Sequence, residues 1–171
     1  NLAPSGTASS GLTTATTQDG DVAITMTGTA PTVAELNKIA SLTTGVVTAS
    51  ISGNKTTLAG LDTASTDAIT ATVTDAVTVA EFNTLDGKTS VGVILTGGVS
   101  DAAAAYASTT GTATSGRTAI AAQDGDAALT VTDAATVAQA NSVATATTGT
   151  VQFSGGITDS TANLMNGDSS A

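Results

Sequence analysis

Short stretches of the chain alternate strictly between apolar and polar residues, which is the pattern of a β-strand with one buried face. The clearest stretch is residues 69–74, where Ile, Ala and Val alternate with Thr, and residues 47–52 and 129–132 show the same alternation. Thr and the β-branched apolar residues are common in strands. Each stretch therefore predicts a short strand whose apolar side chains face a core.

Apolar residues at helical spacing occur between these strands. Residues 33–40, 79–85 and 137–143 each place Val, Leu, Ile, Phe or Ala about one helical turn apart. The residue directly before each segment carries a hydroxyl group, as N-cap residues do: Thr32, Thr78 and Thr136. Gly87 is a suitable end for the second segment. The chain is thus predicted to alternate strands with short helices.

The same phrases recur along the chain. Thr-Val-Ala-Glu-Leu-Asn at residues 32–37 returns as Thr-Val-Ala-Glu-Phe-Asn at 78–83 and as Thr-Val-Ala-Gln-Ala-Asn at 136–141, at spacings of 46 and then 58. Gly-Gly-Val-Ser-Asp at 97–101 matches Gly-Gly-Ile-Thr-Asp at 155–159, again at an offset of 58. Each of these two predicts a weaker helix just after it, with Ser100 or Thr158 as the cap.

These spacings predict half-repeats of about 23 residues, each a strand followed by a short helix. The predicted units are 21–43, 44–66, 67–89, 90–125 with about twelve inserted residues, 126–148 and 149–171. Residues 10–21 resemble residues 115–126 at an offset of 105. Residues 1–20 are therefore predicted to be the tail of a preceding long unit, and the chain is expected to begin and end within an array.

A unit of this size cannot bury its own apolar side chains, so units must stack on one another. Stacked strands about 4.8 Å apart form a parallel sheet, and strand-helix-strand connections in such a sheet are right-handed. The sequence therefore predicts an α/β fold, a right-handed solenoid with a parallel sheet. The alternative is tandem all-β sandwich repeats, which Thr-rich extracellular sequences often form; the helix-spaced apolar residues favour the solenoid.

The composition argues against an enzyme. The 171 residues include 37 Thr and 33 Ala but only two Phe, one Tyr and no Trp. The chain has no His, no Cys and four basic residues, so it lacks the usual general base, the thiolate nucleophile and the soft metal ligands. A core of small side chains fits thin stacked units better than it fits a large globule.

The charge balance limits the partners. The formal net charge is -10, whereas binding to nucleic acid or to an anionic membrane surface needs clustered Lys and Arg. No apolar run approaches the roughly 18 residues that a membrane helix requires. We therefore expect neither nucleic-acid binding nor membrane insertion.

Two acidic pairs are candidate calcium ligands. Asp19 and Asp21, like Asp124 and Asp126, stand one residue apart around a glycine, and carboxylate oxygens suit Ca²⁺. Asp and Gly are equally favoured in a plain turn before a strand. The turn is the simpler interpretation, because each pair offers two side chains and Ca²⁺ needs six or more ligands.

Further polar positions recur with the hexapeptide. Asn37, Asn83 and Asn141 are predicted to be structural, with amides that pair with backbone groups at the turn of each unit. Glu35 and Glu81 are predicted to be solvated helix positions, since Gln replaces them in the third copy.

Stacked strands would also bring Thr side chains together in rows, on a flat surface of the kind that ice-binding solenoids use. The row residues are Thr25, Thr27, Thr48, Thr70, Thr72, Thr130 and Thr132. Ile94, Gln152 and Phe153 interrupt the rows, and Thr is in any case a good exposed strand residue.

One stretch carries a resemblance. Phe-Asn-Thr-Leu-Asp-Gly-Lys-Thr at 82–89, followed by Val-Ser-Asp-Ala at 99–102 and Tyr-Ala-Ser at 106–108, resembles the tandem repeats of very large secreted or surface proteins of marine bacteria, cyanobacteria especially. The resemblance implies extracellular structural or adhesive material. The Gly-Asp nonapeptide of calcium-binding RTX repeats is absent.

The sequence thus predicts an extracellular structural repeat module, secreted or at the cell surface, that acts as a filament, stalk or adhesive spacer and performs no chemistry. Its predicted partners are neighbouring copies or repeats of itself, and surface polysaccharide. Two alternatives stay open: a Thr-face binder of ice or polysaccharide, and a calcium-stiffened adhesin or phage-type fibre.

Overall fold

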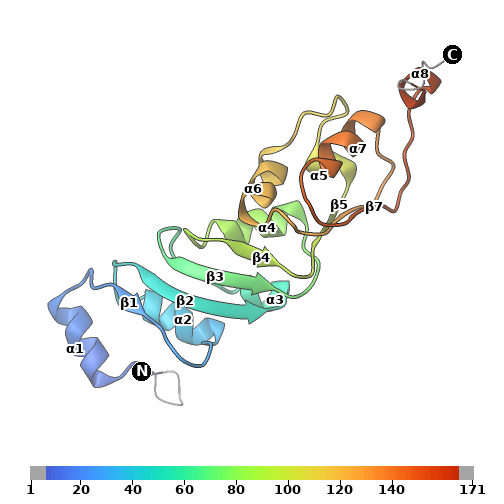
Figure 1. Ribbon diagram of the computed structural model, residues 1–171. Helices are drawn as coiled ribbons and strands as arrows, with labels where there is room; N and C mark the ends of the chain where they lie inside the picture. The colour runs from blue at the N-terminus through green and yellow to red at the C-terminus, as the bar shows by residue number, and fades with distance from the viewer. Residues whose placement is uncertain (1–6, 166–171) are drawn as a thin grey trace. The chain divides into compact units, whose positions relative to one another are not determined.

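Strands and short helices alternate along the chain in the computed structural model, which describes residues 7–165 (Figure 1). In chain order the elements are α1 (Ser10–Gln18), β1 (Ile24–Thr25), α2 (Val33–Ala40), β2 (Val47–Gly53), α3 (Lys55–Leu58), β3 (Ala68–Val73), α4 (Val79–Asp86), β4 (Val93–Leu95), β5 (Val99–Asp101), α5 (Ala103–Tyr106), α6 (Ser115–Gln123), β6 (Leu129–Val131), α7 (Val137–Ala144), β7 (Val151–Phe153) and α8 (Thr161–Leu164). The fold is α/β, so the alternative of all-β sandwich repeats is wrong.

The first sheet contains β1, β2, β3 and β4 in sequence order, and all neighbours are parallel. Ile24 pairs with Val47 and Ala49 pairs with Ile69, so register partners differ in residue number by 23 and by 20. Burial alternates along β2 and β3, with Val, Ala and Ile side chains inside. The strands predicted from the alternation at 47–52 and 69–74 are thereby confirmed.

One face of this sheet carries the helices. Figure 1 shows α2 and α3 along the same side of β1, β2 and β3, and both helices contact the sheet. Leu36 of α2 and Leu58 of α3 are fully buried. The core lies between the helices and the sheet and is built from Val, Leu, Ile and Ala, as the composition predicted.

The second sheet contains β5, β6 and β7, also parallel and in sequence order. Val99 pairs with Leu129, a difference of 30 in residue number, because α6 lies between β5 and β6. Leu129 in turn pairs with Val151, a difference of 22. Two parallel sheets are therefore present where the repeat pattern predicted one.

The chain forms two compact parts. One comprises the residues up to Asp75 together with Asn83–Thr96, and the other comprises Ala76–Phe82 and the residues from Gly97 onward. The six-unit division stays a prediction, and its terminal units, 1–20 and 149–171, include residues 1–6 and 166–171, which lie outside the described residues.

The N-cap predictions are confirmed for the three stronger helices. Thr32, Thr78 and Thr136 each accept a hydrogen bond from the backbone N–H three residues later. Both weaker helices are present, but the caps predicted for them, Ser100 and Thr158, are wrong. Helix α5 begins after Ala102, which has no side-chain cap, and α8 begins after Ser160. Helices α1 and α6 were not expected, because their Thr- and Ala-rich sequences carry almost no apolar spacing.

Candidate functional site

The predicted calcium pairs lie at equivalent helix ends. Asp19 follows α1 and its N–H donates to Ala15 O, and Asp124 ends α6 in the same way. A side-chain hydrogen bond with Asp21 and the charge of Asp21 raise the pKa of Asp19 above its ordinary value. Within residues 7–165, no group of three or more His, Cys, Asp or Glu residues is placed to hold a metal ion. Calcium binding stays a hypothesis.

The three hexapeptide asparagines differ in surroundings. Asn37 binds the backbone of the next predicted unit: its Nδ2 donates to Gly60 O at 2.7 Å, and its Oδ1 accepts from Asp62 N at 2.8 Å. Asn83 and Asn141 are exposed. The same residue in the same phrase therefore differs in exposure from one repeat to the next.

Carboxylates of Asp residues bind helix N-termini of the preceding unit. Each accepts from the N–H of the first helical residue, at 2.6 to 3.1 Å: Asp75 from Lys55, Asp101 from Val79, Asp133 from Ala103 and Asp159 from Val137. An anion is stabilised there by the unpaired N–H groups and by the helix dipole. These four residues, which we call the inter-unit aspartates, join four of the predicted units to the one before.

Hydroxyl groups form a second set of joints. Thr43, Thr89 and Thr147 each donate at 2.7 Å to a backbone carbonyl of the preceding strand region, at Val22, Ile69 and Ala127. Thr89 also accepts from Ile69 N at 3.0 Å and is buried. Asp67, 4% exposed, accepts from Val47 N and from Ala64 N, both at 2.8 Å. These buried polar groups are thus satisfied by backbone, as burial requires.

Sequence reasoning did not find these joints. Their one signal is recurrence: Asp75 and Asp133 are related by an offset of 58, as are Asp101 and Asp159. Thr43, Thr89 and Thr147 follow the hexapeptide spacings of 46 and 58.

The predicted Thr rows are partly present. On the solvent side of the first sheet, register partners carry hydroxyl groups at three levels: Thr25 beside Thr48, Ser50 beside Thr70, and Ser52 beside Thr72. Ile94 ends the last row and is 41% exposed. In the second sheet the row is Ser100, Thr130 and Gln152. Thr27 and Thr132 lie just beyond their strands.

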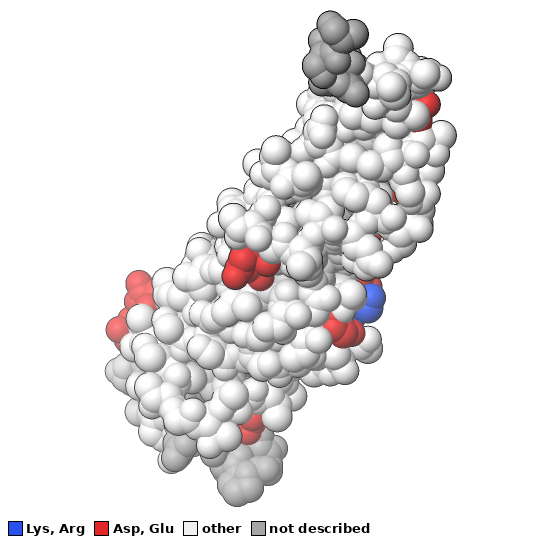
Figure 2. Space-filling model, turned by 45° about the vertical axis from the view of Figure 1, so that its right-hand side comes forward, with Lys and Arg blue, Asp and Glu red and all other residues white. Residues whose placement is uncertain are grey.

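Charge is spread thinly over the surface. Figure 2 shows one face that is mostly uncharged, with acidic side chains in separate groups. A salt bridge joins Lys88 and Asp62 at 3.9 Å on the surface. Among residues 7–165, none of the helices has the length and apolar character needed to span a bilayer.

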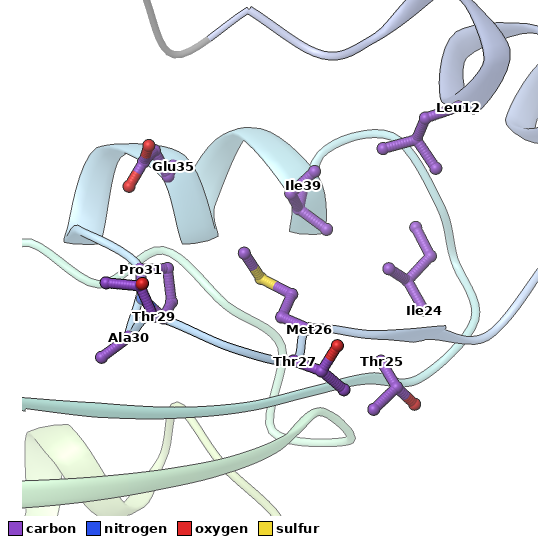
Figure 3. Close-up of a pocket in the computed structure, with 10 residues that line it drawn as sticks. All are labelled: Leu12, Ile24, Thr25, Met26, Thr27, Thr29, Ala30, Pro31, Glu35 and Ile39. Carbon is purple, nitrogen blue, oxygen red and sulfur yellow. The ribbon is translucent and has the colours of Figure 1, made fainter. Parts of the chain in front are cut away.

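A cavity lies beside β1, the edge strand of the first sheet. Its volume is about 630 Å³, and Leu12, Ile24, Met26 and Ile39 line it together with Glu35 and neighbouring Thr residues. Figure 3 shows these four apolar side chains pointing into one space between α1, α2 and β1. The cavity is therefore open to solvent, with apolar side chains of the core on part of its wall and Thr residues and Glu35 on the rest.

The comparisons with known proteins add no relative, because no family model, no curated protein and no solved structure matches this chain. The resemblance to marine bacterial repeats accordingly stays a prediction.

Proposed function

We propose that this chain is an extracellular structural repeat module that serves as a filament, stalk or adhesive spacer and performs no chemistry. The observation that carries the proposal is the set of inter-unit aspartates. Carboxylates are the side chains best suited to chemistry in this chain, and these four are instead bound to helix N-termini of the adjoining unit. Polar groups used in this way support an architecture of repeated units.

We further propose that the strand-helix units belong to a right-handed solenoid. Register partners differ in residue number by 20 to 30, and every pairing is parallel between strands that are consecutive in sequence. Successive strands of one coil would be expected at such a spacing. Secretion or display at the cell surface fits the acidic composition and the absence of Cys.

Self-association tests the filament version of this function. Sedimentation equilibrium over a hundredfold range of protein concentration should show an average mass that rises steadily without reaching a closed oligomer. Negative-stain electron microscopy of the most concentrated samples should show end-to-end particles. A chain that remains monomeric throughout would contradict assembly from this module.

A second candidate is binding through the Thr rows. Three hydroxyl pairs lie in register on the solvent side of the first sheet, at the roughly 4.8 Å strand spacing that suits a regular surface such as ice or a polysaccharide. Thermal hysteresis, or retention on immobilised polysaccharide, should then be lost in the variant Thr70→Lys/Thr72→Lys. Thermal hysteresis or polysaccharide retention that is unchanged in this variant would exclude binding through the Thr rows.

The calcium-stiffened fibre rests on the pair Asp19 and Asp21. If calcium joins these carboxylates, the melting temperature rises with added CaCl₂, falls with chelator, and becomes insensitive to both in Asp19→Asn. A melting temperature that is indifferent to chelator in the unmodified chain removes this alternative.

A further inference from the structure

The chain contains one segment twice, in two settings. Residues 97–107 and 155–165 are related by an offset of 58, and each begins with a parallel bridge to the residues before a helix. Val99 bridges Val77 in the first, and Ile157 bridges Ala135 in the second. We call them the internal segment and the terminal segment.

The two segments differ in burial. Val99 is 1% exposed and Tyr106 is 0% exposed in the internal segment. Their counterparts are 46% exposed for Ile157 and 53% exposed for Leu164. Two large apolar side chains of the terminal segment therefore lie in solvent where their equivalents lie in a core.

The residues that bury the internal segment belong to the same chain. Val99 N donates to Ala128 O at 2.8 Å, and Ser100 pairs with Thr130 of β6. Tyr106 OH donates to Thr130 O at 3.1 Å, and α5 contacts both α6 and α7. The internal segment is thus covered by β6 and by the helices on either side of it in sequence.

This covering surface has its own counterpart at β1. Residues 10–25 match residues 115–130 at an offset of 105, so α1 and β1 correspond to α6 and β6, and α2 corresponds to α7. At β6 the surface carries the internal segment, whereas at β1 the described residues leave the apolar cavity of Figure 3. The cavity residues Ile24 and Met26 correspond to Leu129 and Val131.

We propose that the terminal segment of one copy of this chain adds to the free edge of β1 in a second copy, with Thr158 beside Thr25 and Leu164 in the apolar cavity. The proposal rests on the structural function given above and names the surface that joins the copies. Its geometry is that of the internal interface, with Thr158 in place of Ser100 and Thr25 in place of Thr130.

Three differences distinguish the contact between copies from the internal one. Leu12 replaces Arg117, which binds Ser142 O and Thr145 Oγ1 within the covering surface itself, so that surface is more apolar at its counterpart beside β1. Glu35 replaces Gln139, whose Nε2 donates to Ala107 O. The sequence has no Asp at 26–31 to replace Asp133. We therefore expect reversible association, weaker than the covalently continuous interface.

Formation of a disulfide between copies tests directly whether the terminal segment lies beside β1. The chain has no Cys, so single-cysteine variants Thr25→Cys and Thr158→Cys can be mixed under mild oxidation. Register partners in neighbouring strands lie within the distance that a disulfide spans. We expect a mixed disulfide dimer, identified by mass spectrometry. The matched control is Thr48→Cys, on the same face but one strand inward, which should not cross-link to Thr158→Cys.

Sedimentation equilibrium measures the strength of self-association. Leu164→Asp should weaken self-association about tenfold or more, because a Leu side chain no longer fills the cavity. Ile94→Asp is the control, since Ile94 is similarly exposed but lies on β4, away from this surface. Circular dichroism should show both variants folded.

The outcomes separate the two proposals. Equal cross-linking of Thr25→Cys and Thr48→Cys to Thr158→Cys, or none in a chain that still self-associates, overturns this surface and leaves the filament function standing. Equal sedimentation of Leu164→Asp and Ile94→Asp also overturns the surface. An unmodified chain that stays monomeric overturns both this surface and the filament version of the proposed function.

Discussion

The internal and terminal segments show what a short sequence determines and what it leaves to its neighbours. Both carry an Asp that accepts hydrogen bonds from the backbone N–H of the next residue and from the first residue of the preceding helix: Asp101 in one, Asp159 in the other. Their burial nevertheless differs almost completely. The local conformation is therefore determined by the repeated sequence itself. Burial depends instead on the elements that come after the segment in the chain.

The largest predicted effect compares two equivalent glycines. Gly98 has a φ of 73°, and a Cβ built on it would lie 2.6 Å from Ala128 O; Gly156 has a φ of 77° and open space around it. Gly98→Ala should lower the free energy of unfolding by about 3 kcal/mol, through strain and a backbone clash, and Gly156→Ala by about 1 kcal/mol, through strain. Urea unfolding measures both.

Equal losses of unfolding free energy in the two variants would mean that the internal and terminal segments are equally buried by neighbouring residues. Gly156→Ala also tests the association, because the added methyl group would meet Ala23 O of a second copy. The variant should therefore self-associate less than the unmodified chain while remaining folded.

The next effect concerns the residue that covers the end of the internal segment. Gln139 is 4% exposed, and its Nε2 donates to Ala107 O at 3.0 Å. Gln139→Glu removes the donor and buries a carboxyl group, which should cost about 2 kcal/mol at neutral pH. Urea unfolding at pH 7 and pH 4 should show the loss diminishing in acid, as the carboxyl group protonates.

Glu35→Gln is the matched control, since Glu35 occupies the same position in α2 and is half-buried. Hydrogen bonds from Thr32 N–H and from its hydroxyl group lower the pKa of Glu35, so this residue is ionised at neutral pH. The substitution should leave stability nearly unchanged. A loss of unfolding free energy as large as that of Gln139→Glu would contradict the conclusion that Gln139 is covered by the internal segment and Glu35 has no such cover.

A smaller effect separates the caps of α5 and α8. The N-cap of α5 is Ala102, so Asp133 from the next unit provides its side-chain acceptor, whereas α8 has its own N-cap in Ser160. Asp133→Ala should destabilise α5 by about 1 kcal/mol. Hydrogen exchange by mass spectrometry should show faster exchange in residues 103–106, and unchanged exchange in residues 161–164.

Ser160→Ala is the converse variant and should speed exchange in α8 without affecting α5. If either variant speeds hydrogen exchange equally in α5 and α8, then the two caps do not stabilise their own helices separately.

The smallest effect is a pH dependence at the terminal segment. Hydrogen bonds from the Asn163 amide and from the backbone N–H groups of Ser160 and Val137 lower the pKa of Asp159 below its ordinary value of 3.8. The stabilisation is therefore fully present above pH 3.8 and is lost as the pH falls through the lowered value. NMR titration of Asn163 should follow this loss, and Asp159→Asn should abolish it.

The strands and the stronger helices were predictable because their signals are local. The alternation at residues 69–74 and the capped segment after Thr78 each lie within one element. The division into two sheets was not predictable, because only residues 96–98 separate β4 from β5, which belong to different sheets. Helix α6 was also not predictable, because Ile120 is its one large buried side chain. Leu129 lies beside Val99 although α5 and α6 both lie between them in sequence.

The inter-unit aspartates were hidden for a different reason. Each binds a backbone N–H group, which every residue except Pro carries, so no complementary side chain marks the partner. Asp75 and Lys55 look unrelated in the sequence, although Asp75 Oδ1 accepts from Lys55 N at 2.7 Å. Recurrence at an offset of 58 was present, but it does not say what a recurring Asp binds.

The short sequence separation of these joints bears on how the chain folds. The bonds made by the inter-unit aspartates and by Thr43, Thr89 and Thr147 connect residues only 20 to 30 apart. Loops of this length cost less entropy to close than longer ones do, so no joint depends on a contact that is remote in sequence. Each of these joints needs only the adjoining strand-helix segment, so it can form during synthesis before the rest of the chain has left the ribosome.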